Sequence, residues 1–355
     1  MAPPIPATPD DVTATWLGDA LDLPVRSIES EPIGVGAGLL GDLLRVTPTY
    51  TGDHTDAPAS VIVKLPTHAP ANKAIGMAFQ FYERELRFYA EVAPTARVRT
   101  PKVFHSAMDI AAERFVLVLE DLSALELADQ VAGMSVDQAI RAVQAIAPFH
   151  AQWWDTPELA ALDWMPTADH PITMQSAKLY KDSWDHFVEK WGHVVPAGGL
   201  EVGAAVRDAF EGMLIKLARP PRTITHTDFR GDNLFFGEKE VAVIDWQLTT
   251  RSGGAYDVAY LLAQSMEVEL RREHEKAIQR AWYDRLCAAG VKDYSWEDAL
   301  KDYAASVLVC LVVAVSAGAD MDLGNARGEA LVRGISERAF SAALDVDWQG
   351  VLDRV

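Results

Sequence analysis

The sequence has few cysteines, few basic residues for its acidic content and no long apolar run. Cys287 and Cys310 are the only cysteines among 355 residues, which excludes a disulfide framework or a cysteine-rich zinc site and fits a reducing compartment. The 32 basic residues face 51 acidic ones, and the net charge of −19 makes nucleic acid and anionic membranes poor partners. The longest apolar run, Val307–Val315, is far shorter than the roughly 20 residues of a membrane helix. Because the start shows no signal-peptide pattern, we expect a cytoplasmic protein with no nucleic-acid or membrane partner.

The remaining composition is typical of a globular enzyme. Hydrophobic residues make up 49% of the chain and charged residues 23%, so disorder and fibrous structure are disfavoured. The length predicts about two domains. Strand-like patterns dominate the first third and helical patterns the rest, which predicts a small strand-rich lobe and a larger helical lobe. The expected parts are residues 1–24, an extension with one helix; 25–119, the first lobe; 120–123, a hinge; and 124–355, the helical lobe.

Local patterns predict the main elements. Asp10 is a candidate cap for a first helix ending near Leu21. β-branched and aliphatic runs predict strands in the first lobe, and an apolar stripe at helical spacing predicts a helix among them. Gly237 opens the turn of a predicted hairpin in the second lobe. The expected strands cover residues 43–49, 60–65 and 114–119, and the expected longer helices cover residues 78–92, 265–289 and 295–317.

Polar residues with catalytic potential gather around the predicted hairpin. The segment HTDFRGDNLFF at 226–236 is followed by the apolar strand VAVI and then by Asp245. The hairpin would bring Asn233 and Asp245 side by side, and their hard oxygen atoms suit magnesium carried in with a nucleotide. Asp228, on the same loop, would face that spot as a base or a hydroxyl-orienting group, which is what phosphoryl transfer requires. The alternative is an ordinary loop with Asp and Asn as turn residues.

Lys64 ends an apolar strand in the first lobe, where a lysine needs an anionic partner. Glu85 lies on the inward stripe of the predicted helix and is the candidate partner. Such a pair can hold the ammonium group against nucleotide phosphates. The alternative is that Lys64 reaches solvent and Glu85 is a surface charge.

A glycine segment precedes the predicted strand over 43–49. The spacing of Gly34, Gly36, Gly38 and Gly41 does not open a helix, which excludes a dinucleotide-binding loop of the Rossmann type. The P-loop motif is also missing from the chain. A hairpin lid over phosphates fits this segment, and a plain flexible turn is the alternative.

These segments, in this order, resemble the aminoglycoside phosphotransferase and ecdysteroid kinase-like superfamily of small-molecule kinases, which share the protein-kinase fold. The resemblance covers most of the chain and is most specific at the loop of Asp228. It implies an α+β, bilobal fold: a small antiparallel-sheet N-lobe with one inserted helix, which binds nucleotide, and a larger, mainly helical C-lobe for catalysis and acceptor binding. The segments that carry it are IGVGAGLLG at 33–41, VIVK at 61–64, ELRFY at 85–89, FVLVLEDL at 115–122, APFHA at 147–151, HTDFRGDN at 226–233, IDWQ at 244–247 and YDVAYLL at 256–262.

The resemblance also implies roles for individual residues. Asp228 is the implied catalytic base, and Asn233 and Asp245 are the implied ligands of the Mg²⁺ that accompanies ATP. Other implied roles lie around these: Lys64 paired with Glu85 for the α- and β-phosphates, the backbone of Glu120 and Leu122 for adenine at the hinge, and His226 and Asp257 as supports of the catalytic loop.

The sequence departs from the family pattern in two ways. Thr227 stands where relatives usually have glycine, which puts the backbone angle of the loop in question. Only a short stretch separates Asp245 from Asp257, and no Ala-Pro-Glu motif follows. The chain is therefore too short there for an activation segment, and a protein substrate is not expected.

Further residues have two readings each. Arg230 could meet the transferring phosphoryl group or pair with Asp232 or another carboxylate. Several tryptophans fall within one helical stretch, where they could wall an acceptor pocket or simply pack the core. His150 is expected to be a hydrogen-bonded core residue, and the histidine spacing does not support zinc. The candidate pocket residues are Trp153, Trp154 and Trp184.

Together these observations predict an ATP- and Mg²⁺-dependent kinase that phosphorylates a hydroxyl group of a small molecule. One alternative is a catalytically inactive nucleotide-binding protein. Another is a metal-dependent phosphohydrolase using Asp228, Asp232 and Asp245. The acceptor stays open among aminoglycosides, sterols, macrolides, choline, sugars and hydroxyacyl-CoA, as does the choice between ATP and GTP.

Overall fold

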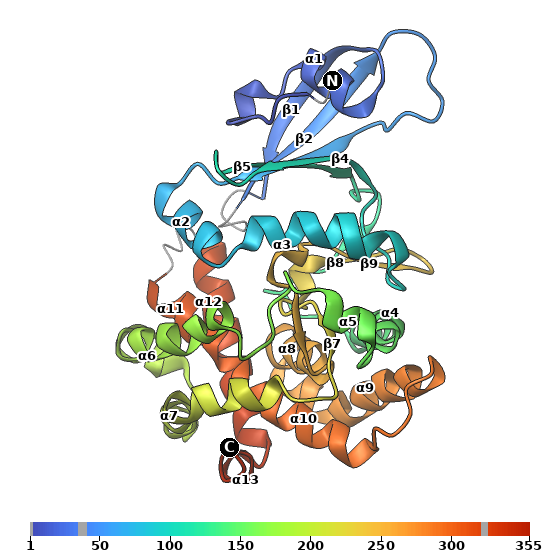
Figure 1. The fold of residues 1–355 in the computed structure, drawn as a ribbon. Helices are drawn as coiled ribbons and strands as arrows, with labels where there is room; N and C mark the ends of the chain where they lie inside the picture. Colours follow the sequence, from blue (N-terminus) through green and yellow to red (C-terminus); the bar gives the residue numbers. More distant parts are fainter. Residues whose placement is uncertain (1–2, 35–40, 321–325) are drawn as a thin grey trace. The chain divides into compact units, whose positions relative to one another are not determined.

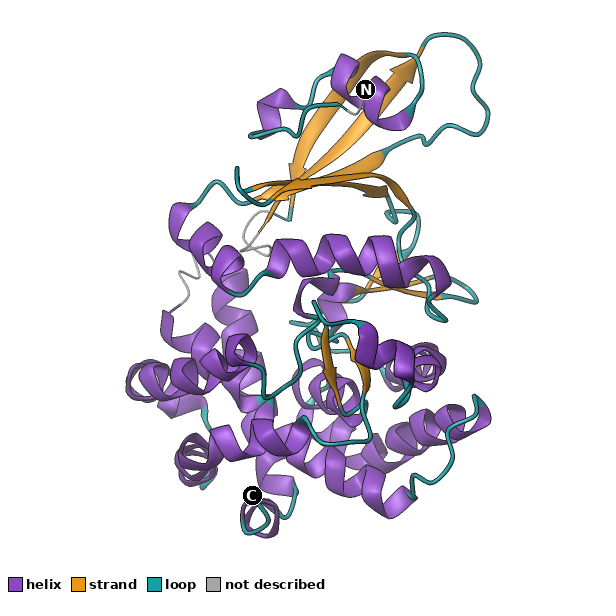
Figure 2. Ribbon diagram, in the orientation of Figure 1, coloured by secondary structure: helices purple, strands orange, loops and turns teal. Residues whose placement is uncertain are grey.

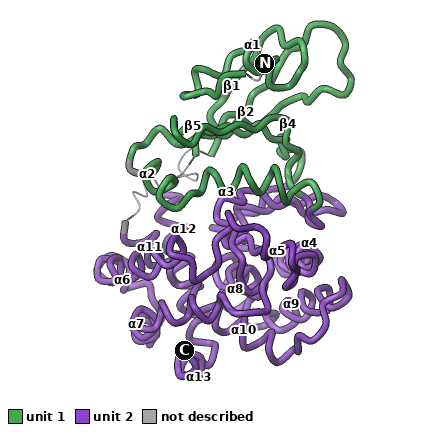
Figure 3. Tube along the Cα trace, in the orientation of Figure 1, with its two compact units in different colours: residues 1–95, 100–125 green, residues 96–99, 126–355 purple. Residues whose placement is uncertain are grey.

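The structure is a computed structural model that describes residues 3–34, 41–320 and 326–355. The chain divides into two compact units (Figure 3). Unit 1 comprises residues 1–95 and 100–125, and unit 2 comprises residues 96–99 and 126–355. Figure 1 labels the elements along the chain, and Figure 2 shows that unit 1 holds one large sheet whereas helices make up most of unit 2.

Unit 1 is built on a five-stranded antiparallel sheet with the strand order β1-β2-β3-β5-β4. The three strands predicted from the sequence are present, and two further strands complete the sheet. Every second side chain of β3 is buried, as the pleat of a half-buried strand requires. The strands are β1 (Val25–Ile33), β2 (Gly41–Tyr50), β3 (Val61–Pro66), β4 (Val103–Asp109) and β5 (Arg114–Glu120).

Helix α1 (Ala14–Leu21) packs its buried residues Trp16 and Leu17 into the core of the sheet. The prediction that Asp10 caps this helix is wrong. The Thr13 side chain accepts the hydrogen bond of the Trp16 backbone N–H at 3.2 Å, because Asp10 lies in a separate short turn, Pro9–Asp11.

The helix predicted over 78–92 is present in interrupted form. Helix α2 (Pro70–Ala78) ends before Gln80, whose backbone is left-handed with φ 57°. Helix α3 (Phe81–Arg87) then begins and continues into a π-helical turn over Phe88–Val92. The left-handed residue breaks the hydrogen-bond ladder, which the apolar pattern of the sequence does not record.

Unit 2 contains most of the helices and two small antiparallel sheets. The predicted hairpin is confirmed: β8 pairs with β9, and Gly237 N–H donates to Glu240 C=O at 3.0 Å in the turn. Strand β6 extends this sheet, and β7 pairs with β10. The strands are β6 (Glu126–Leu127), β7 (Thr223–Thr225), β8 (Leu234–Phe236), β9 (Val241–Val243) and β10 (Thr250–Ser252).

Two long helices predicted for unit 2 are divided in the structure. The segment 265–289 holds the last residue of α8, then a break, and then α9. The segment 295–317 begins at Ser295, whose hydroxyl accepts the Asp298 N–H as a cap, and is interrupted at Cys310. The helices of unit 2 are α4 (Val136–Trp153), α5 (Pro157–Ala161), α6 (Pro171–Trp191), α7 (Gly199–Leu217), α8 (Ala255–Ser265), α9 (Val268–Ala288), α10 (Trp296–Val309), α11 (Leu311–Asp320), α12 (Ala326–Asp345) and α13 (Trp348–Leu352).

Within the described ranges, one segment, Trp296–Ala319, is long and apolar enough to cross a membrane by length and composition. Most of its apolar window is buried inside the protein, as in the core helix of a soluble protein.

Candidate functional site

Unit 1 contains the predicted contact between Lys64 and Glu85. The Nζ atom of Lys64, on β3, lies 2.8 Å from both carboxylate oxygens of Glu85, on α3. The Glu85 side chain is 3% exposed and the Lys64 side chain 12%. A pair this buried holds the ammonium group in one place, since an unpaired charge there would be costly.

Acidic and hydroxyl side chains also fix the chain at the predicted hinge. Asp121 accepts hydrogen bonds from Ser60 Oγ at 2.7 Å and Arg45 Nε at 2.9 Å. Burial alone would raise the pKa of Asp121, but its hydrogen bonds outweigh burial and lower it. The Glu120 N–H donates to the Lys102 carbonyl at 2.8 Å, so an adenine contact at Glu120 would use its carbonyl group. The side chain of Leu122 is buried.

The glycine segment is described in part. Gly34 follows the end of β1 and has a left-handed φ of 66°, which favours glycine. Gly41 begins β2, and a Cβ atom there would lie 3.2 Å from Lys64 Cε. Gly36 and Gly38 lie outside the described residues.

In unit 2, the fully buried Asp257 of α8 holds the start of the loop that carries Asp228. Its carboxylate accepts the backbone N–H of His226 at 2.8 Å and that of Thr227 at 2.9 Å. It also accepts His150 Nε2 at 3.1 Å. His150 Nδ1 in turn accepts the indole N–H of Trp282 at 3.1 Å, so this histidine is a hydrogen-bonded core residue, as predicted. Asp257 thereby satisfies three donors that would otherwise be buried unpaired.

His226 joins the loop that carries Asp228 to the hairpin formed by β8 and β9. Its Nδ1 accepts the Asp228 N–H at 3.2 Å, which places the proton on Nε2, and Nε2 donates to the Ile244 carbonyl at 2.8 Å. The ring also packs edge-on against Trp246 with a centroid distance of 4.6 Å. His226 therefore ties the residue before Asp245 to the loop that carries Asp228.

Thr227 adopts the backbone conformation that glycine would favour. Its φ is 68°, in the left-handed region. A β-branched residue is strained there, so the surrounding contacts must hold it. Asp257 binds its N–H, and its hydroxyl lies 3.1 Å from that of Thr225. The departure from the family pattern thus changes the residue type without changing the backbone shape that glycine usually provides.

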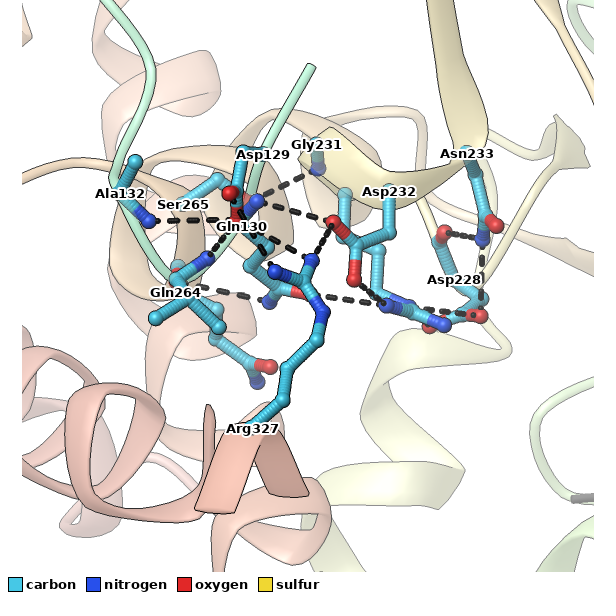
Figure 4. A network of polar contacts seen from close by, with 12 residues as sticks. Asp129, Gln130, Ala132, Asp228, Gly231, Asp232, Asn233, Gln264, Ser265 and Arg327 are labelled. Carbon is cyan, nitrogen blue, oxygen red and sulfur yellow. Dashed lines mark hydrogen bonds and ion pairs between the residues drawn. The ribbon is translucent and has the colours of Figure 1, made fainter. Parts of the chain in front are cut away.

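Asp228 is held by three hydrogen-bond donors. The hydroxyl of Tyr260 donates to Oδ1 at 2.7 Å. Asn233 Nδ2 donates to Oδ2 at 2.9 Å (Figure 4). Arg230 Nε lies 3.1 Å from both oxygens. The Asp228 side chain is 14% exposed, so it is positioned by the protein and still reaches the surface.

Arg230 lies between two carboxylates. While Nε contacts Asp228, Nη1 contacts Asp232 Oδ2 at 3.3 Å and Gln130 Oε1 at 2.9 Å. Burial alone would lower the pKa of Arg230, but the negative charges of Asp228 and then of Asp232 raise it. Arg230 was expected either to meet the transferring phosphoryl group or to pair with a carboxylate. The contacts with Asp228 and Asp232 are those of the second alternative.

Beyond Arg230 the charges continue to alternate. Asp232 Oδ1 accepts the Gln130 N–H at 2.9 Å and lies 3.4 Å from Arg327 Nη2. Figure 4 shows Arg327, at the start of α12, reaching both Asp232 and Asp129. The Arg327 and Asp129 side chains are about half exposed, at 50% and 48%, so a chain of ion pairs connects the loop of Asp228 to the surface.

The residues predicted to bind magnesium have suitable atoms. Asn233 precedes β8 and Asp245 follows β9, and the Ile244 N–H donates to the Asn233 carbonyl at 3.1 Å, which keeps the two ends of the hairpin together. The Asn233 Nδ2 atom is bound to Asp228, so its amide oxygen is directed away from that residue. Asp245 has a left-handed φ of 65°. One amide oxygen and one carboxylate form the hard, partial ligand set that magnesium with nucleotide phosphates requires.

The described part of the chain contains no dedicated metal cage. Among the residues that the structure describes, no group of three or more His, Cys, Asp or Glu side chains could hold a metal ion. Asp232 is engaged with Arg230 and Arg327. The two-metal centre of a phosphohydrolase therefore has no support in the described part of unit 2.

The three candidate pocket tryptophans lie in packed surroundings. Trp184 stacks on Tyr180 at 5.9 Å, and a Cβ atom at Gly203 would approach its ring to 2.3 Å. Trp154 packs against Tyr294 at 4.9 Å. Trp153 and Trp184 are 8% and 6% exposed. These contacts agree with the interpretation that the tryptophans pack the core. Trp154 and Trp184 each pack against a different tyrosine.

Sequence reasoning missed Tyr260 as a site residue. Tyr260 follows Asp257 by three positions on α8, so both side chains emerge on one face of the helix. This spacing from Asp257 is the sequence feature that indicates a position for Tyr260 near the loop of Asp228. Gln130, Asp129 and Arg327 come from distant segments, and no sequence spacing connects them to the loop.

Comparison with protein families and solved structures agrees with this geometry. Residues 35–292 match the ecdysteroid kinase-like family. The chain therefore belongs to this family, and the superfamily resemblance read from the sequence is confirmed.

Similar solved structures include the choline kinase of Cryptosporidium parvum Iowa II, with a TM-score of 0.56, 12% identity and coverage of 91% of each chain. A microcompartment-associated aminopropanol kinase has a TM-score of 0.54 and 17% identity, covering 93% of this chain and 95% of its own. A choline/ethanolamine kinase family protein of Mesorhizobium loti has a TM-score of 0.52 and 15% identity, covering 92% and 91%. At these identities the likeness establishes the fold, and the predicted kinase-like α+β class is confirmed. No curated protein sequence matches the chain significantly.

Proposed function

We propose that this protein transfers the γ-phosphoryl group of ATP to a hydroxyl group of a small molecule, with magnesium. The observation that carries the proposal is the placement of Asp228 in unit 2. Three donors fix its carboxylate, and one of them, Asn233, belongs to the magnesium-ligand pair formed with Asp245. A fixed carboxylate beside a partial magnesium site is the arrangement that in-line phosphoryl transfer needs.

In this proposal Asp228 accepts a hydrogen bond from the acceptor hydroxyl and orients its oxygen toward the γ-phosphorus. The bond between the acceptor oxygen and phosphorus forms as the bond from phosphorus to the β,γ-bridging oxygen breaks. ADP leaves with that electron pair, and the hydroxyl proton passes to Asp228. Asn233 and Asp245 would hold magnesium that enters with the nucleotide, and its charge would offset the negative charge that develops on the phosphates.

Unit 1 contributes the other proposed nucleotide contacts. Lys64, held by Glu85 at 2.8 Å, is suited to the α- and β-phosphates because its ammonium group is fixed and mostly buried. The carbonyl of Glu120 and the backbone of Leu122 are the proposed adenine contacts. Gly34, Gly36 and Gly38 are the proposed phosphate lid, and residues 120–123 are the proposed hinge.

The proposed acceptor is a small-molecule alcohol. The proposed location of the protein itself is the cytoplasm. The proteins of similar fold include, by name, kinases of choline and of aminopropanol, which supports a small alcohol rather than a protein. The short stretch from Asp245 to Asp257 supports the same conclusion.

A coupled ADP-release assay tests the proposal. Purified protein with Mg-ATP is offered aminoglycosides, sterols, macrolides, choline, sugars and hydroxyacyl-CoA thioesters. We expect an acceptor-dependent rate that falls at least about a hundredfold in Asp228→Ala, while ATP still binds. Near-normal turnover in Asp228→Ala would refute the role of this carboxylate. ATP binding without turnover on any acceptor would favour the inactive nucleotide-binding protein.

A further inference from the structure

Helix α8 contacts the catalytic loop through one face. Asp257 binds the backbone of residues 226 and 227, Tyr260 binds the side chain of Asp228, and Ser265 Oγ accepts the Gly231 N–H at 3.1 Å. The positions 257, 260 and 265 differ by three and eight, which places them on the same side of a helix. The helix is entirely buried, so it is a rigid support for the loop.

Tyr260 differs from the other two because it touches the proposed base itself. Its hydroxyl lies 2.7 Å from Asp228 Oδ1, the shortest of the contacts that the Asp228 carboxylate makes with its three donors. Tyr260 is 2% exposed. Burial, together with the negative charge of Asp228, raises the pKa of Tyr260 well above its usual value, so the hydroxyl keeps its proton and remains a donor.

The donors around Asp228 restrict where a further group can bind. An ionised carboxylate has about four lone-pair positions. Tyr260 and Asn233 occupy one on each oxygen, and Arg230 Nε lies equally far, at 3.1 Å, from both. These donors together leave little of the carboxylate open, so their geometry restricts where the hydroxyl of an acceptor can bind.

Arg230 does not replace Tyr260 in this arrangement. Its Nη1 atom contacts Asp232 and Gln130, so the guanidinium group is anchored on the side of Asp228 where those two residues lie. Tyr260 holds Oδ1 from the helix. We propose that Tyr260 is a positioning residue that fixes the orientation of the Asp228 carboxylate and thereby the site of the acceptor hydroxyl. This inference rests on the proposed function of Asp228.

The test compares Tyr260→Phe with Tyr256→Phe, a matched control. Tyr256 lies one turn earlier on the same helix, is 5% exposed, and its ring packs 6.1 Å from that of Tyr260. Its hydroxyl is near Cys310. Both variants lose one buried hydroxyl, but only Tyr260→Phe removes a donor from Asp228.

We expect Tyr260→Phe to lower kcat by about ten- to a hundredfold, as for a lost hydrogen bond to a charged group. The KM for Mg-ATP should stay within about twofold of wild type, since Tyr260 acts on the base. Tyr256→Phe should keep the wild-type kcat. A kcat of Tyr260→Phe within about twofold of wild type, or equal losses in both variants, would overturn the inference.

A second measurement does not depend on turnover. In protein labelled with ζ-¹³C tyrosine, the resonance lost in Tyr260→Phe identifies Tyr260, and the one lost in Tyr256→Phe identifies Tyr256. We expect Asp228→Asn to shift the Tyr260 resonance and to leave that of Tyr256 in place. An unmoved Tyr260 resonance would overturn the inference. If wild-type protein turns over no acceptor, the proposed function fails, and this spectrum still decides whether Tyr260 holds Asp228.

Discussion

Replacing Asp257 by Asn should destabilise unit 2 because this buried carboxylate serves three donors. Its two oxygens accept the N–H groups of His226 and Thr227 at 2.8 and 2.9 Å, and His150 Nε2 at 3.1 Å. An Asn side chain offers one oxygen. If that oxygen keeps His226 and His150, the Thr227 N–H faces an amide NH₂ group and loses its acceptor.

The expected cost follows from this count. One buried donor left without an acceptor costs about 1–3 kcal/mol, and the two hydrogen bonds that remain lose the charge of their acceptor. We therefore expect the free energy of unfolding to fall by about 2–4 kcal/mol, a large part of the roughly 5–15 kcal/mol of a typical domain.

Urea denaturation followed by tryptophan fluorescence measures this change. All the tryptophans except Trp16 belong to unit 2, so the signal reports on the unit that carries Asp257. Asp353→Asn, at an exposed position of the same unit, is the control and should change stability by less than about 0.5 kcal/mol. A loss no larger in Asp257→Asn than in this control would refute the assignment of Asp257 as the support of the loop.

Two further substitutions test the local physics. Thr227→Gly should raise the free energy of unfolding by about 1 kcal/mol in urea denaturation, because glycine adopts the φ of 68° without strain; a loss of stability would mean that the hydroxyl contact with Thr225 outweighs the strain. Burial raises the pKa of Asp302, so the contribution of Asp302 to the free energy of unfolding is fully present below about pH 4 and is lost as the pH rises through the raised pKa. Asp302→Asn, which can still accept the Tyr294 hydroxyl, should therefore be more stable than wild type at about pH 7 and equal to it at about pH 3, and equal stability at both would contradict the shift.

The sequence predicts best where one local pattern determines the outcome. The β-branched and aliphatic run of β3 and the turn at Gly237 were sufficient for the strand and the hairpin. The break at Gln80 was not predictable, because a left-handed residue other than glycine leaves no mark on an apolar stripe. Thr13 rather than Asp10 caps α1, since several residues there can cap a helix and only the path of the chain selects one.

The candidate site follows the same rule. The motif around Asp228 identified the loop, and the contact between Lys64 and Glu85 followed from an apolar strand and a helix stripe. The surroundings of Arg230 could not be predicted, because Gln130, which contacts it, and Arg327, which contacts Asp232, lie far away in the sequence. Tertiary packing determines such contacts, and they cannot be inferred from the spacing of residues in the sequence.

The central claim is transfer of the γ-phosphoryl group to an alcohol, and label transfer tests it most directly. Protein incubated with γ-³²P-ATP, magnesium and the acceptor panel should place the label on an acceptor, and Asp228→Ala should reduce that transfer at least about a hundredfold. Label found only in inorganic phosphate, at a rate independent of any alcohol, would contradict the account and indicate a hydrolase. Label that stays in ATP although ATP binds would contradict it as well and indicate an inactive nucleotide-binding protein.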